Sequence, residues 1–158
     1  MFLTAIDART GGLATFDRDS GVAPVDAVTA STALPGLVPT VPIHGSRYID
    51  SGVRSSTNLD VASGCAQVLV LAALGGRGQR PPEAGQFEGL RRPPEWGMDL
   101  EIQTEALRRQ GSHVVVITPD ADSRSARGTN QMDQATRIPA AGAGFAQGRR
   151  EATCSGGL

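Results

Sequence analysis

The chain has 158 residues, of which 39% are hydrophobic and 20% charged. This composition is typical of a soluble globular protein of one domain, and no apolar run approaches the roughly 20 residues that cross a bilayer. The net charge is −1 and the basic residues are scattered arginines, which argues against a nucleic-acid partner. The first residues lack the pattern of a secretory signal, so we expect a cytoplasmic protein without a transmembrane segment.

The first third of the chain predicts short strands and one small helix. Residues 2–6 and 13–17 form a predicted β-hairpin around two glycines. Pro24 stands in a first-turn position of a helix that we expect to stop before Pro35. Two more short strands follow, and the second ends at Asp50.

The remainder alternates predicted helices with apolar strands. A helix capped by Thr57 or Asn58 precedes "VLVLAAL" at 68–74, a run typical of a parallel strand covered on both faces. Residues 75–97 are rich in glycine and proline and predict a surface loop. Residues 98–111 then predict an amphipathic helix, on which Leu100, Thr104 and Leu107 share a face.

A last apolar strand at 113–120 and a helix at 138–152 complete an α/β pattern with a mainly parallel sheet. We find no second domain, so residues 1–158 are treated as one. The first strand begins at the first residue. A buried strand there would pair with an element further upstream, and an unpaired sheet edge would favour self-association.

Asp50 is the main candidate for chemistry. It ends a predicted strand and is followed by the small residues Ser51 and Gly52. In α/β folds reactive groups collect at the carboxyl ends of strands, and partial burial makes a carboxylate a better proton acceptor. The alternative is a turn aspartate that binds its own backbone, which Asp followed by Ser and Gly often does.

Other reactive residues lack partners at suitable spacing. His44 and His113 have no acidic or histidine partner in a metal-binding pattern, and Cys65 and Cys154 form no CxxC. We therefore expect no metal, no cofactor and free thiols. Trp96, with Arg91 and Arg92 nearby, is interpreted as a packing residue, with contact to a lipid headgroup as the alternative.

Several segments together resemble the C-terminal half of the patatin-like phospholipase domain in its bacterial form. They are "ASTALPG" at 30–36, Pro39 and Pro42, "GSRYIDSG" at 45–52, and the "TNLDVA" continuation at 57–62. The segments before and after them are similar to the preceding strand pair and the closing helix of that family. The resemblance implies an incomplete three-layer α/β/α fold with a mainly parallel central sheet.

The family resemblance also implies an activity. Patatin-like enzymes are lipid acyl hydrolases that act on phospholipids and other acyl esters. They use a Ser–Asp dyad in which a serine in a GxSxG elbow attacks the ester and an aspartate in a DGG or DGA motif takes its proton. Carried over to this sequence, Asp50 matches the proton acceptor and Gly52 the last position of its motif.

Two departures from the family pattern bear on activity. Ser51 stands where the family has glycine, and a positive φ at that position would strain a side chain. GxSxG and the glycine-rich oxyanion loop are absent. We therefore expect an inactive fragment of a longer frame or a remnant, with a non-catalytic pseudoenzyme or protein-interaction module as the alternative. Ser51, Ser55 and Ser56 are poor substitutes for the nucleophile.

Overall fold

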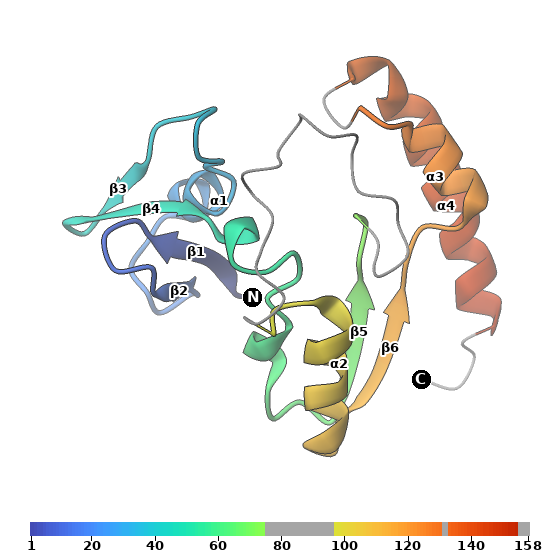
Figure 1. The fold of residues 1–158 in the computed structure, drawn as a ribbon, viewed down its shortest axis with the longest axis horizontal. Coiled ribbons are helices and arrows are strands. Elements are labelled where there is room, and N and C mark those ends of the chain that lie inside the picture. Colours follow the sequence, from blue (N-terminus) through green and yellow to red (C-terminus); the bar gives the residue numbers. More distant parts are fainter. Residues whose placement is uncertain (75–96, 131–132, 155–158) are drawn as a thin grey trace. The chain divides into compact units, whose positions relative to one another are not determined.

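The computed structural model describes residues 1–74, 97–130 and 133–154 as a mixed α/β chain (Figure 1). The strands are β1 (Leu3–Asp7), β2 (Leu13–Phe16), β3 (Val41–Ile43), β4 (Ser46–Asp50), β5 (Gln67–Leu71) and β6 (His113–Ile117). The helices are α1 (Pro24–Ser31), α2 (Leu100–Arg109), α3 (Ala121–Arg127) and α4 (Arg137–Cys154), with short 3-10 helices η1 (Ser51–Val53), η2 (Leu59–Ala62) and η5 (Gln134–Thr136).

The chain divides into two compact units. The first comprises residues 1–68 and 88–114, and the second residues 69–87 and 115–158. The predicted loop at 75–97 lies outside the described residues except for Gly97, and so do Arg91, Arg92 and Trp96. Within the described part of the chain, no helix is both long enough and apolar enough to span a membrane.

The first unit contains a four-stranded antiparallel sheet in the order β2-β1-β4-β3. The predicted hairpin is confirmed as β1 and β2, with Leu3 opposite Phe16. β1 also pairs with β4, where Ala5 faces Asp50. The expectation that the first strand needs an upstream neighbour is therefore wrong, because β1 is paired on both sides and the edges of this sheet are β2 and β3.

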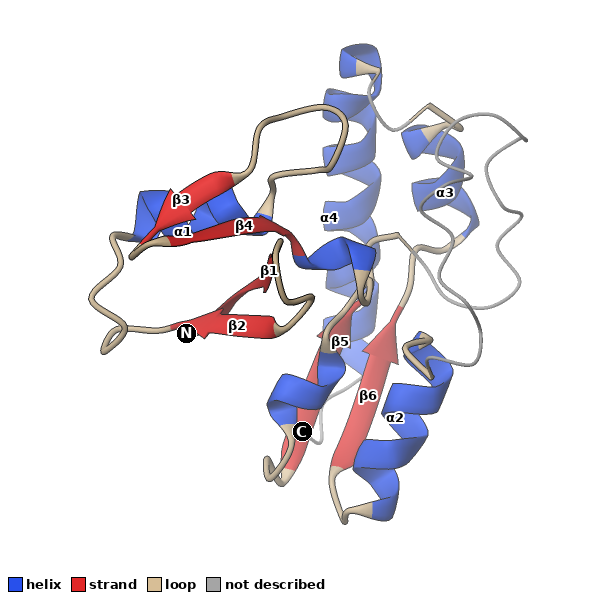
Figure 2. Ribbon diagram, turned by 60° about the vertical axis from the view of Figure 1, so that its left-hand side comes forward, coloured by secondary structure: helices blue, strands red, loops and turns tan. Residues whose placement is uncertain are grey.

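Small residues let α1 pack closely on this sheet (Figure 2). Ala27 and Ala30 of α1 are buried, and they form one core cluster with Ala5, Phe16 and Ile43. The helix starts at Pro24 as predicted, since proline has no N–H to lose in a first turn. Because Ala5, Ala27 and Ala30 are short, α1 can lie close to β1 and to β4, the strand that ends at Asp50.

β5 and β6 form the parallel pair (Figure 1). The His113 N–H donates to Ala66 at 2.8 Å, and the Ala72 N–H donates to Ile117 at 2.9 Å. Parallel pairing here is as predicted, but the other described strands are antiparallel: short turns join β1 to β2 and β3 to β4 as hairpins, and β1 also pairs antiparallel with β4. The predicted coverage of β5 on both faces is wrong: Val70 is 5% exposed, whereas Leu69 and Leu71 are 52% and 70% exposed.

In the second unit, Gln147 of α4 joins the helices to the end of β6. Its side-chain oxygen accepts from the Asp120 N–H at 3.0 Å and from the Ser123 hydroxyl at 2.9 Å. Its amide nitrogen donates to the Thr118 carbonyl at 2.8 Å. Asp120 caps α3 by accepting from the Ser123 N–H, which holds the pKa of Asp120 below its ordinary value.

Candidate active site around Asp50

Asp50 is placed by backbone pairing on two sides. It is the last residue of β4, opposite Ala5 of β1, and its N–H donates to the Ala33 carbonyl beyond the end of α1 at 3.0 Å. Its side chain is partly buried. The predicted position at a strand end is confirmed, although β4 belongs to an antiparallel sheet.

One carboxylate oxygen of Asp50 is held by the backbone two residues on. Oδ1 accepts from the Gly52 N–H at 2.6 Å, and this bond caps η1. A Cβ on Gly52 would lie 2.9 Å from Oδ1, closer than real side chains approach, so the carboxylate occupies the space that glycine leaves. This geometry is the turn aspartate foreseen as the alternative. It also leaves Oδ2 without a hydrogen bond to the described residues.

Ser51 is buried and points away from this turn. It is 4% exposed, and its hydroxyl lies 2.8 Å from Thr4 Oγ1 and 3.1 Å from Asn58 Nδ2. The described non-glycine residues with positive φ are His44 and Asn58. The condition under which a side chain at position 51 would be strained is therefore not met, because this backbone does not enter the left-handed region there.

Of the serines after Asp50, Ser51 and Ser55 form structural hydrogen bonds. Ser55 is fully buried, and its hydroxyl donates to Gln103 Oε1 at 3.0 Å while accepting from the Asn58 N–H at 2.9 Å. Ser56 is exposed. Among the described residues we find no hydrogen bond from Ser51, Ser55 or Ser56 to Asp50.

Gln103 is a residue that the sequence interpretation missed. It lies on α2 between the buried residues Leu100 and Leu107, and it is itself 6% exposed. Its Oε1 accepts from the Ser55 and Thr57 hydroxyls and from the Leu59 N–H, at 3.0 to 3.3 Å. A glutamine three residues after an apolar core position was the available signal, because a buried amide needs partners.

The helix predicted after Thr57 is shorter than expected. Asn58 adopts the left-handed conformation with φ 44°, and only η2 follows it. Arg54 completes this turn by donating to Asn58 Oδ1 at 3.1 Å and by pairing with both carboxylate oxygens of Asp60, at 3.0 and 2.6 Å. The hydrogen bonds from Arg54 hold the pKa of Asp60 below its ordinary value.

The histidines and the described cysteine thiol lie apart from this site. His44 is in the turn between β3 and β4, His113 begins β6, and Cys65 is free and exposed. Within residues 1–74, 97–130 and 133–154, we find no group of three His, Cys, Asp or Glu side chains that could hold a metal ion.

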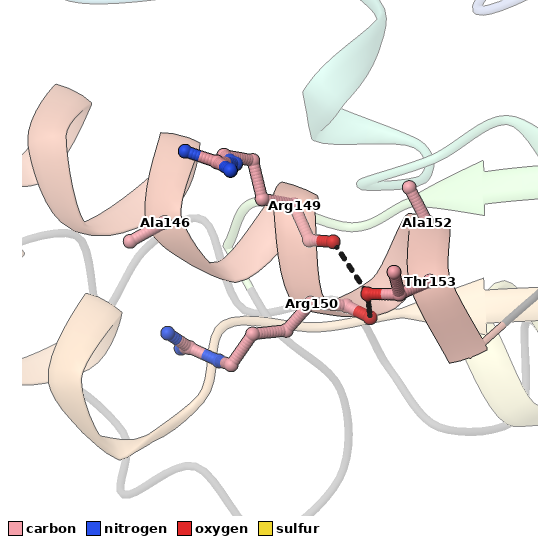
Figure 3. A pocket seen from close by; sticks show the side chains of 5 residues that line it. All are labelled: Ala146, Arg149, Arg150, Ala152 and Thr153. Atoms are coloured by element: carbon pink, nitrogen blue, oxygen red, sulfur yellow. Dashed lines mark hydrogen bonds between the residues drawn. The ribbon is translucent and has the colours of Figure 1, made fainter.

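A shallow pocket of the second unit lies along α4 and contains no residue of the predicted site (Figure 3). The Thr153 hydroxyl lies 2.9 Å from the carbonyl oxygens of both Arg149 and Arg150, within the helix. Ala146 and Ala152 complete the lining. With its one hydroxyl bonded to the helix backbone, this surface offers no activated nucleophile.

Comparison of the sequence with models of known protein families finds no match, and comparison with curated proteins finds none either.

Proposed function

We propose that this chain carries the C-terminal half of a three-layer patatin-like domain with a mainly parallel central sheet, in which Asp50 is the general base of a Ser–Asp dyad. The observation that carries the proposal is the Asp50 carboxylate at a strand end. Its Oδ1 is held by the Gly52 N–H at 2.6 Å, and the "DSG" run resembles the family motif. A carboxylate fixed through one oxygen can use the other to accept a proton.

The nucleophile and the oxyanion donors would come from a segment outside these 158 residues, since the sequence has no GxSxG. The serine hydroxyl attacks the carbonyl carbon of a lipid acyl ester, and Asp50 takes its proton. The alcohol leaves with a proton returned to it, and the acyl-enzyme is hydrolysed by water. Each backbone donor at the oxyanion contributes on the order of 3 kcal/mol. Without these parts, the chain alone hydrolyses no ester.

The DNA upstream of the Met1 codon tests the proposal. We expect an in-frame GxSxG there, with no stop codon between it and Met1. The second expectation is that the 158-residue chain gives no turnover of a chromogenic short-chain ester. Turnover by the chain alone that disappears in Asp50→Ala would show that the nucleophile lies within it.

A non-catalytic interaction module is the second candidate, and two observations favour it. The bond from Gly52 to Asp50 is a complete local turn that needs no catalytic role. Leu69 and Leu71 of β5 also expose large apolar side chains, which suit a partner chain or a second copy. Sedimentation measures this: Leu69→Ser with Leu71→Ser lowers the average mass if these residues associate, whereas a monomeric wild-type chain counts against the module.

A further inference from the structure

Ser51 links the candidate base to two separate parts of the first unit. It follows Asp50 directly and precedes Gly52, whose N–H holds the carboxylate. Its hydroxyl meets Thr4 on β1 and the Asn58 amide from the segment after η1. A buried hydroxyl between two polar partners at this position is not required by the turn itself, which needs only the Asp50 carboxylate and the Gly52 N–H.

The partners of Asn58 fix the direction of its amide. Nδ2 donates to Ser51 Oγ and to the Ser55 carbonyl, both at 3.1 Å, and Oδ1 accepts from Arg54. Turning the amide over would place its oxygen against the Ser55 carbonyl oxygen and its nitrogen against the Arg54 guanidinium. The residue is 5% exposed, so water cannot replace these bonds. Because Asn58 donates to Ser51, the hydrogen of the Ser51 hydroxyl is available to Thr4 Oγ1.

We propose that Ser51 is a positioning residue, and that its bonds to Thr4 and Asn58 set the orientation of the Asp50 carboxylate. The inference rests on the proposed function only in treating Asp50 as a base. Because the Ser51 hydroxyl is bonded to both Thr4 and Asn58, the backbone at the start of η1 is held in place, and this keeps the Gly52 N–H against Asp50 Oδ1. At this position the family that the chain resembles has glycine, whereas the serine here holds the turn through its hydroxyl.

The proposal makes an unusual prediction for Ser51→Gly, which restores the residue found in the family. Glycine removes the hydroxyl and adds backbone freedom, so the turn loosens instead of improving. Ser51→Ala removes the hydroxyl alone. Thr4→Val replaces the partner hydroxyl by a methyl group of similar size and leaves residue 51 intact.

The test is the NMR signal and hydrogen exchange of the Gly52 amide, relative to the Ile6 amide in the centre of the sheet. Loss of one buried hydrogen bond corresponds to about a tenfold change. We expect Gly52 exchange to rise about tenfold relative to Ile6 in all three variants, with an upfield shift of the Gly52 proton toward its position in Asp50→Ala. Ser56→Ala, an exposed serine of the same segment, leaves both readouts unchanged.

An unchanged Gly52 shift and exchange ratio in folded Ser51→Ala and Thr4→Val overturns the proposal. If the Ser51 variants do not fold, Thr4→Val decides it alone. An equal rise for Gly52 and Ile6 also overturns it, because that indicates general destabilisation. The result is independent of ester hydrolysis: a missing upstream serine removes the proposed function and leaves the positioning of Asp50 measurable.

Discussion

Gly52 lies so close to the Asp50 carboxylate that a methyl group does not fit. In Gly52→Ala the new Cβ would stand 2.9 Å from Oδ1, so the carboxylate or the turn must shift. We expect the free energy of unfolding to fall by about 1 to 3 kcal/mol, measured by urea denaturation. Ser56→Ala in the same segment is the control, with a change within about 0.5 kcal/mol. Equal stability of both variants would show that the turn adapts without cost.

The Arg54–Asp60 ion pair makes the stability of the first unit depend on pH. The pKa of Asp60 is lowered in the folded chain, so the folded state binds fewer protons than the unfolded one. Its contribution is complete above the ordinary aspartate value near 4 and is lost as pH falls through the folded value. We expect Asp60→Asn to lose less stability between pH 5 and pH 3 than wild type.

Urea midpoints at the two pH values measure this difference, and Asp19→Asn, at an exposed turn, is the control for removing one charge. The same pH dependence in Asp60→Asn as in wild type would mean that the Arg54 pairing adds nothing to stability.

α2 is anchored to the Asp50 segment through Gln103. Gln103→Ala leaves the buried Ser55 hydroxyl and the Leu59 N–H without their acceptor, which costs about 1 to 3 kcal/mol. Gln110→Ala at the C-cap of the same helix removes the exposed bond from the Ser63 hydroxyl and is the matched control, with an expected loss in the free energy of unfolding of less than about 0.5 kcal/mol. Denaturation followed by circular dichroism compares them, and similar losses would contradict the anchoring role.

An element could be predicted where residues close together in the sequence determine it, and not where residues far apart in the sequence do. Local sequence patterns were enough to predict three features: the start of α1 at Pro24, the buried face of α2, and the hairpin of β1 and β2. The role of Gln103 could not be predicted in this way, because its partners are more than forty residues away in sequence. The short η2 in place of the predicted helix after Thr57 reflects the left-handed Asn58. Whether Leu71 is covered depends on tertiary packing, which an apolar run does not specify.

Within the candidate site, the sequence placed Asp50 at a strand end and left its role open. The structure shows that the Gly52 N–H contacts the Asp50 carboxylate, which explains why a glycine stands at position 52. It also shows that Ser51 is buried, which a run of small residues did not indicate. These details depend on Thr4 and Asn58, residues from different elements whose hydroxyl and amide meet only after folding.

Across the whole molecule, the two units differ in how much apolar surface they bury. The buried hydrophobic residues described in the second unit are Val70 and Ala72, whereas the first unit has a cluster around Phe16 and a second group on α2. Because burial of apolar surface drives folding, we expect α4 amides to exchange faster than those of β1. Hydrogen exchange with mass spectrometry measures this, and slower exchange in α4 would contradict it.

The central claim is that Asp50 takes the proton of a serine supplied from outside these residues. Its most direct test is ester turnover by the polypeptide translated from the nearest upstream start codon in frame with Met1, compared with its Asp50→Asn variant. Loss of a general base predicts a fall of about 10² to 10⁴-fold in kcat, with the protein still folded. Equal turnover by the two proteins would contradict the claim.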